Sequence, residues 1–158
     1  MIENLKEPVT IEALMLANHV EAVNGLLYMS GGGWTDHYRA VQPNGQAPVS
    51  HFGIGLSLRI PWNETNQPHH LNVRVENEDA TIIIANIDTQ INVGRPPQLA
   101  LGSIQHAVIG VSIDTMFPRA GGYRIVARIG EDGDSKTWPF RVHDTQVASL
   151  ATPQMPPA

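Results

Sequence analysis

The stretch that decides the fold is YRIVARI at residues 123–129, followed by the turn-rich run GEDGDS at 130–135 and by WPFRV at 138–142. The first run places an apolar residue at every second position, and both of its arginines fall between them. Successive side chains of an extended strand point to opposite faces, so this alternation predicts a strand with one buried and one solvated face. The two runs and the turn between them predict a half-buried β-hairpin.

Similar alternation recurs through most of the chain. Strands are predicted at about residues 10–18, 26–29, 52–60, 71–76, 81–85, 87–93, 107–113, 123–129 and 138–142. Short strands separated by turn signals, without an amphipathic helix, are typical of an antiparallel sandwich. The predicted fold class is therefore all-β, an antiparallel two-sheet β-sandwich of about nine strands, either immunoglobulin-like or jelly-roll-like. A closed barrel is the main alternative.

The length of 158 residues predicts one domain. The sandwich is expected over residues 10–143, after an N-terminal segment at 1–9. Residues 144–158 are small, polar and proline-containing, which predicts a disordered tail. If consecutive strands alternate in direction, the loop at 61–69 lies at one end of the sandwich, and the loops at 31–48, 94–103 and 131–134 lie at the other.

Composition limits the classes of partner and chemistry. The chain has no cysteine, which excludes disulfides, thiolate catalysis and cysteine-based zinc sites. The net charge is −5 and the ten basic residues are scattered, so no nucleic-acid partner is expected. No apolar run approaches the length of a membrane span, and no signal sequence is recognised, so we expect a cytoplasmic protein without a membrane partner. No cofactor is expected.

Two single residues carry structural expectations. Pro139 has no amide hydrogen, so its strand is predicted to lie at a sheet edge or to contain a bulge there. Tyr123 follows a glycine pair at the start of the penultimate strand, as in the tyrosine corner of immunoglobulin-like sandwiches. A plain core tyrosine is the alternative.

Four motifs stand in an order that resembles a known family: GGGW at 31–34, RIPWNETNQPH at 59–69, VGRPP at 93–97 and PFRV at 139–142. The family is a bacterial one of small proteins, catalogued only as a domain of unknown function. The resemblance covers about residues 13–142, and its most specific piece is WNETN at 62–66. It implies a single all-β domain and carries over no catalytic residues.

The loop around Trp62 is the first candidate binding site. The indole offers a flat apolar face, and polar groups follow it closely, which suits a small polar ligand or a partner. The polar candidates are Asn63, Glu64, Asn66 and His69, with His70 beside them. The competing interpretation is structural: the side chains satisfy turn amides and the indole covers the end of the core.

The second candidate is the long loop that holds Trp34, His37 and Tyr38. Aromatic side chains on such a loop can dock a protein partner, or they can plug the end of the sandwich. Metal binding by His69 and His70 is not expected, because neighbours on a strand face opposite ways. Calcium at the acidic turns 131–135 and 77–79 is not expected either, because the spacing of a calcium loop is absent.

Hydrolysis is not expected, because no serine lies in a glycine-flanked elbow between a strand and a helix. The serines considered are Ser30, Ser50, Ser57 and Ser112. The sequence therefore favours a non-enzymatic β-sandwich that binds a protein partner or assembles with itself, through an edge strand or its long loops. A small-ligand or metal-binding module, conceivably an enzyme, that uses the Trp62 and His69–His70 region is the alternative. A structural component of a virion or other particle is a weaker one.

Overall fold

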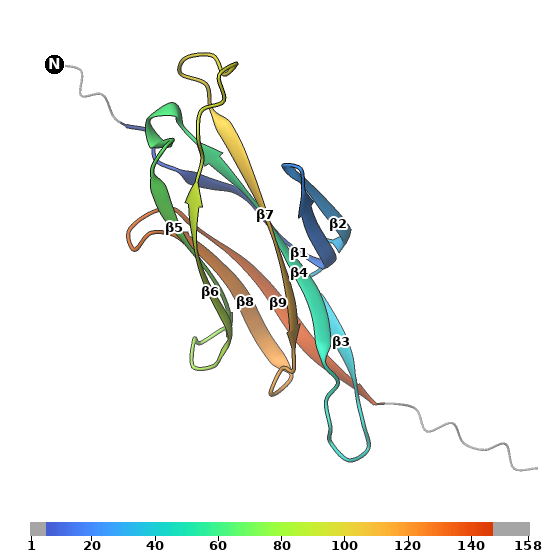
Figure 1. The fold of residues 1–158 in the computed structure, drawn as a ribbon. Coiled ribbons are helices and arrows are strands. Elements are labelled where there is room, and N and C mark those ends of the chain that lie inside the picture. Colours follow the sequence, from blue (N-terminus) through green and yellow to red (C-terminus); the bar gives the residue numbers. More distant parts are fainter. Residues whose placement is uncertain (1–5, 147–158) are drawn as a thin grey trace, which may run out of the picture.

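The computed structural model describes residues 6–146, over which nine strands form two sheets with a shared core (Figure 1). In the first sheet the spatial order is β2-β1-β4-β7. In the second it is β3-β9-β8-β5-β6. The bounds of the first sheet are β1 Thr10–Val23, β2 Leu26–Gly32, β4 Ser50–Ile60 and β7 Gln105–Thr115. Those of the second are β3 Asp36–Val41, β5 Pro68–Asn77, β6 Ile83–Asn92, β8 Gly121–Ile129 and β9 Ser135–Gln146.

The prediction of an all-β chain with nine strands in two sheets is confirmed. The second sheet is a curled half-barrel. It is a mixed sheet, because β3 pairs with β9 in parallel whereas every other pair is antiparallel. Within the described residues, no helix is long and apolar enough to cross a membrane. The sandwich runs past the boundary predicted at 143, since β9 continues to Gln146; the rest of the predicted tail lies outside the described residues.

The core forms between the inner faces of the two sheets, where the alternation of the sequence placed it. Leu56 on β4, Val73 on β5 and Ile125 on β8 are at most 1% exposed. Ile91 on β6 is only half-buried, because β6 is the last strand of its sheet. Burial of such side chains is the dominant favourable term in folding a domain of this kind.

The tyrosine-corner interpretation is confirmed at Tyr123. The ring is 2% exposed, and its hydroxyl donates to the carbonyl of Arg119, four residues upstream, at 2.6 Å. A buried tyrosine hydroxyl needs such a partner. The contact also anchors the connection from β7 to β8 against the core.

Two errors in the predicted strands cancel in the count. Residues 36–41, expected in a loop, form β3, and the strands predicted at 81–85 and 87–93 form one strand, β6. Asn86, expected at a turn, lies in the ladder opposite Arg74. The predicted distribution of the loops between the two ends of the sandwich is therefore wrong. The pairing of the strands places the connections at 61–67, 93–104 and 130–134 at the same end.

Pro139 lies on an internal strand, because β9 stands between β3 and β8. The prediction of an edge strand is therefore wrong for β9 as a whole. At Pro139 itself, however, β9 is unpaired on the side that faces β3, since β3 pairs with β9 only from Arg141 onward. At Pro139 the side of β9 facing β3 has no strand beside it, so the missing amide hydrogen leaves no ladder bond unmade.

The far half of the β1–β2 hairpin folds over the outer face of the first sheet (Figure 1). Its turn, Asn24-Gly25, has positive φ at both residues, as a two-residue type I′ turn requires. The glycines of β4 and β7 make room for it. A Cβ at Gly53 would lie 2.7 Å from the backbone nitrogen of Val20, and one at Gly110 would lie 3.1 Å from its side chain.

Candidate functional site

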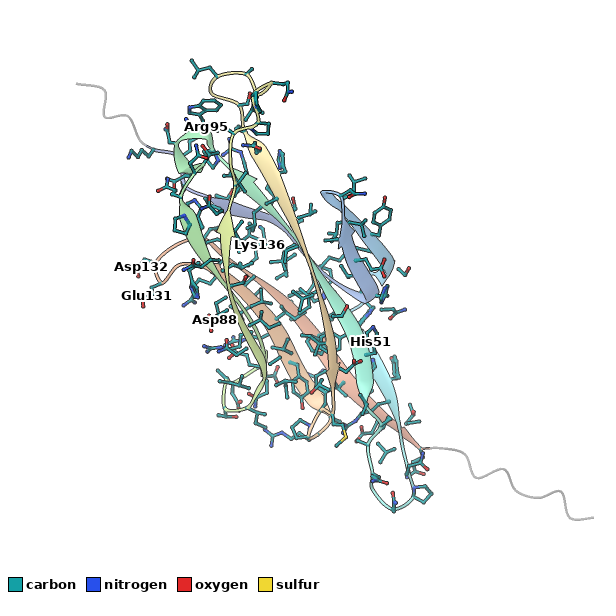
Figure 2. The ribbon with its side chains drawn as sticks, viewed as in Figure 1. His51, Asp88, Arg95, Glu131, Asp132 and Lys136 are labelled. Atoms are coloured by element: carbon teal, nitrogen blue, oxygen red, sulfur yellow. The ribbon has the colours of Figure 1, made fainter. Side chains whose placement is uncertain are left out.

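The loop around Trp62 connects β4 to β5 through a short 3-10 helix, η1 (Trp62–Glu64). Arg95, from the connection between β6 and β7, lies over the indole with its guanidinium carbon 3.9 Å from the ring centroid (Figure 2). Its Nε donates to Thr65 Oγ1 at 2.6 Å, and its Nη2 donates to the Trp62 carbonyl at 2.7 Å. The cation–π contact and these hydrogen bonds cover the ring face that was expected to receive a ligand.

Several groups of this loop bond within it or to the neighbouring connection: the side chains of Gln67 and His69, and the backbone of Asn63, Glu64 and Asn66. His69 Nε2 lies 2.6 Å from the Glu64 carbonyl and 3.7 Å from its carboxylate. Gln67 donates to the carbonyl of Asn63 at 2.8 Å, and the amide of Asn66 donates to the Val93 carbonyl at 2.8 Å. This geometry favours the structural interpretation of the loop over a ligand site.

His70 faces away from His69, as the strand periodicity predicts, and its Nε2 lies 2.9 Å from Asp88 on β6. Over residues 6–146 the structure brings together no group of three potential metal-ligating side chains. Asp88 is held ionised mainly by a hydrogen bond from Asn72, which lowers the pKa of its carboxyl below the usual range, with His70 adding to the shift.

The candidates of the second loop do not lie together. Trp34 precedes β3, and His37 and Tyr38 lie on opposite faces of that strand. Trp34 packs edge-on against Phe52 and Phe140, with ring centroids 6.4 and 5.8 Å away, so it closes the core. His37 stacks on Trp34 at 5.5 Å. Tyr38 points outward, is 65% exposed and stacks on His143 at 4.8 Å. Only Tyr38 is therefore placed to meet a partner.

The two tryptophan loops belong to separate clusters. Trp34 contacts Phe52 near the start of β4, whereas Trp62 follows the end of that strand. A strand rises about 3.3 Å per residue, so the two rings are separated by roughly 25 Å along β4. One ligand of small size does not reach both.

His37 and Ser50 form a histidine–serine pair, with Nε2 2.8 Å from Oγ. Burial lowers the pKa of His37 below its usual range, and the charge of Arg39 lowers it further. A neutral imidazole beside a hydroxyl is the start of a catalytic dyad. Ser50 is only 4% exposed, however, so a substrate has no access to its hydroxyl. The pair is better explained as structural.

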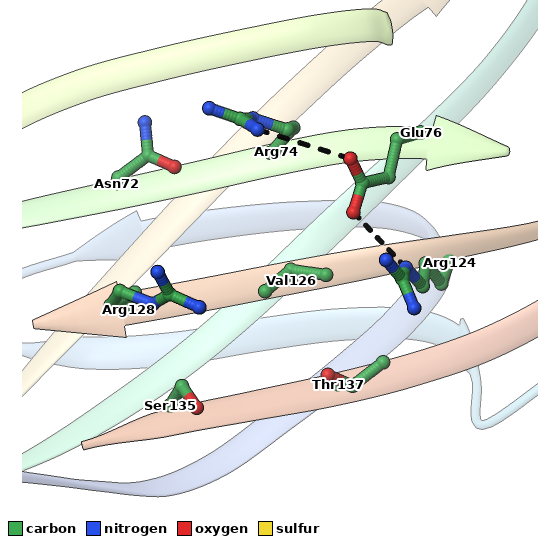
Figure 3. A pocket seen from close by; sticks show the side chains of 8 residues that line it. All are labelled: Asn72, Arg74, Glu76, Arg124, Val126, Arg128, Ser135 and Thr137. Carbon is green, nitrogen blue, oxygen red and sulfur yellow. Dashed lines mark hydrogen bonds and ion pairs between the residues drawn. The ribbon is translucent and has the colours of Figure 1, made fainter. Parts of the chain in front are cut away.

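An arginine-rich hollow of about 240 Å³ lies on the outer face of the second sheet, where sequence analysis predicted no site (Figure 3). We call it the arginine hollow. Three adjacent strands line it: Asn72, Arg74 and Glu76 from β5, Arg124, Val126 and Arg128 from β8, and Ser135 and Thr137 from β9. Three of the ten basic residues, which look scattered in the sequence, are thus gathered at one place.

Glu76 organises the arginine hollow. Its side chain is 6% exposed, and Arg124 Nε donates to one carboxylate oxygen at 3.0 Å. Arg74 Nη1 lies 3.9 Å from the other oxygen. A buried carboxylate needs such cationic partners. Three arginines against one carboxylate leave two positive charges among the lining residues.

The sequence contains part of the signal for this hollow. Arg74, Arg124 and Arg128 each fall on the solvated face of a predicted strand. What the sequence does not contain is the pairing of β5 with β8, strands separated by β6 and β7 along the chain. That pairing sets Arg124 opposite Glu76 and Arg128 opposite Asn72.

The outer edge of β7 is the other notable feature. Among the described residues β7 pairs on one side only, with β4, in eleven consecutive registers without a shift. Its inner-face residues Ala107, Ile109 and Val111 are half-buried, because the sheet ends with them. The strand contains neither proline nor lysine, the residues that commonly protect an edge from pairing.

A comparison with curated proteins found no match to this chain. A comparison with protein-family models found one match, which covers residues 12–143 and so spans β1 to β9. The family is described as one of unknown function. On this match the chain belongs to the family of unknown function DUF6941.

Proposed function

We propose that the protein is a non-enzymatic β-sandwich that assembles with a second copy of itself through the unpaired edge of β7. The observation that carries the proposal is the long regular edge without proline or lysine, bordered by half-buried apolar side chains. An edge of this kind presents a row of free amide and carbonyl groups that another strand can pair with.

The other end strands are less suited to pairing. β2 and β3 contain seven and six residues, against eleven for β7. β6 contains ten, but its pairing with β5 shifts register between Val75 and Glu76. Such irregularities increase the local twist and make a strand a poorer template.

A symmetric antiparallel pairing of two β7 strands about Gly110 matches both charge and apolarity. In this register His106 of one copy lies opposite Asp114 of the second copy, and this occurs twice by symmetry. Ile109 then lies opposite Val111 of the second copy, which extends the apolar inner face across the interface. An imidazole directly across a ladder from a carboxylate can donate a hydrogen bond to it, which favours pairing.

A charge-swap experiment tests the register by sedimentation velocity. His106→Asp places two carboxylates opposite each other at both symmetric positions, and we expect dimerisation to weaken about tenfold. The double variant His106→Asp/Asp114→His restores opposite charges between the copies and is expected to recover the dimer.

The double variant also separates this effect from contacts within one chain. His106 lies 2.8 Å from Glu12, and Asp114 lies 2.6 Å from His51. The first contact is lost in both variants and the second is lost in addition in the double variant, so the contacts within one chain do not explain a recovery. Gln90→Asp on β6 is the matched control and should leave the dimer intact. A wild-type protein that stays monomeric, or a double variant no better than the single one, refutes the proposal.

A ligand site at the Trp62 loop is not proposed, because Arg95 covers the indole and the loop satisfies its own polar groups.

A further inference from the structure

We propose that the arginine hollow binds a phosphate group, either as free phosphate or as the phosphate of a small molecule. The inference is independent of the association through β7, which involves the other sheet. It is based on the placement of three arginines, on unused donors among them and on the local charge.

The backbone places the three guanidinium groups close together. Arg74 lies opposite Val126, with Arg124 and Arg128 two residues away on either side of Val126 on the same strand face. Neighbouring strands lie about 4.8 Å apart, so an anion above Val126 would be within reach of all three long side chains. In Figure 3 Arg124 and Arg128 flank the short side chain of Val126 along β8, and Arg74 lies on the neighbouring strand β5.

Two of the arginines have hydrogen-bond donors without a partner among the described residues. Arg74 Nε is shielded from solvent and has no hydrogen-bond partner among the described residues. Arg128 likewise makes no side-chain hydrogen bond or ion pair to any residue between 6 and 146. Two hydroxyl groups, of Ser135 and Thr137, complete the rim on β9. Guanidinium forks and hydroxyls are the groups that bind the oxygens of phosphate.

The charge of the hollow suits a dianion. Its lining carries three positive charges and the negative charge of Glu76, within a chain of net charge −5. Glu76 is committed to Arg124 and Arg74, and it holds both guanidinium groups in place. Asp88 stands beside the hollow, where Asn72 and His70 bind its carboxylate at 2.9 Å each. A phosphate monoester carries about −1.5 to −2 at neutral pH, which matches the two unbalanced positive charges of the lining.

The geometry distinguishes the hollow from an ordinary solvated strand face. On such a face, arginines extend into water or pair one-to-one with carboxylates. Here one nearly buried carboxylate orients two arginines, and a third arginine remains for a ligand. Preorganised donors of this kind reduce the cost of ordering side chains when a ligand binds.

The test is titration of the full-length protein with sodium phosphate, followed by amide chemical shifts and by calorimetry. We expect saturable shifts confined to residues around Arg128, Ser135 and Thr137, with a dissociation constant in the millimolar range or tighter, about 1 mM. Arg128→Gln should weaken binding about tenfold, because it removes a charge-assisted donor. Arg59→Gln, which removes an arginine on the first sheet paired with Glu7, should leave binding unchanged.

Two further arms identify the source of the phosphate. Tighter binding of a phosphomonoester such as glycerol 3-phosphate assigns the hollow to a phosphorylated small molecule, and tighter binding of inorganic phosphate assigns it to the free ion. Shifts that do not saturate by about 10 mM phosphate, or equal losses in Arg128→Gln and Arg59→Gln, overturn the proposal. Because these variants leave β7 unchanged, sedimentation separates a failure here from a failure of the dimer.

Discussion

At the scale of single residues, ion pairs with a buried arginine are expected to stabilise the fold more than ion pairs on the surface. Arg39 is 5% exposed; its Nε donates to Asp144 at 2.6 Å, and its Nη1 donates to the carbonyl of Phe117. Arg59 also forms an ion pair, with Glu7 at 2.9 Å, but the carboxylate is 63% exposed. The first pair ties β3 to β9 and to the β7–β8 connection, whereas the second is largely solvated.

We therefore predict different costs for removing the two arginines. Arg39→Leu leaves the Phe117 carbonyl without its donor inside the protein and should lower the free energy of unfolding by about 2 kcal/mol. Arg59→Gln should change it by less than about 1 kcal/mol, because exposed ion pairs contribute little. Urea denaturation of both variants measures the difference. Equal losses would mean that Arg39 is not the anchor of β3.

A second residue-scale prediction concerns pH. Burial lowers the pKa of His37 in the folded protein, so the unfolded chain binds a proton more readily than the native one. Stability should therefore be full above the unfolded value of about 6.5 and fall as the pH drops from there toward the lower folded pKa.

His37→Gln keeps a group that can hydrogen-bond to Ser50 but cannot titrate. Melting temperatures measured between pH 7.5 and 5 should therefore fall less in this variant than in the wild type. A parallel decline of the two proteins would show that His37 does not contribute to the pH dependence.

At the scale of elements, the β1–β2 hairpin depends on glycines of other strands. Gly53 and Gly55 on β4 and Gly110 on β7 replace side chains on the outer face of the first sheet. At Gly53 an added Cβ would meet the backbone nitrogen of Val20 at 2.7 Å, which cannot yield as a flexible side chain does. At Gly110 the nearest atom would be a methyl carbon of Val20 at 3.1 Å.

Gly53→Ala should therefore push the hairpin off the sheet and cost about 1–3 kcal/mol of stability, as overpacking commonly does. Hydrogen exchange should accelerate in β2 while the second sheet stays protected. Gly110→Ala is the milder control, with a smaller effect in the same segment. Unchanged exchange in β2 would mean that the hairpin does not rest on Gly53.

The success of the sequence predictions differed among elements for physical reasons. Strands with one buried face, such as β4 and β8, follow a two-residue alternation that the sequence displays directly. β3 was missed because its inward positions are His37, Arg39 and Val41, so polar residues that are satisfied only in the folded protein conceal the pattern. β6 was divided at Asn86, whose amide oxygen accepts a cross-strand hydrogen bond from Asn72 instead of forming a turn.

At the scale of the whole molecule, strand pairing decides which residues from distant parts of the chain lie side by side, and the alternation within a single strand does not predict this. The sequence places each arginine of the hollow on a solvated strand face, but only the pairing of β5 with β8 brings them together. For the Trp62 loop, the sequence showed the candidate residues but not the residue that covers them. Trp62 and His69 were visible in the sequence, and Arg95, which covers the indole, comes from a loop that was assigned to the opposite end.

The proposed assembly through β7 is supported by the order of strands in the first sheet. β7 ends that sheet with eleven regularly paired residues on one side, and no described strand pairs with its other side. Two such edges that pair would join the first sheets of two copies into one continuous sheet of eight strands.

The most direct test is amide hydrogen exchange resolved along β6 and β7 at low and high protein concentration. We predict that amides of β7 between His106 and Asp114 exchange more slowly as concentration rises, in step with a mass that approaches twice 17.2 kDa. Exchange in β6 should stay constant. Exchange in β7 that is independent of concentration, at a mass of 17.2 kDa throughout, would contradict the account.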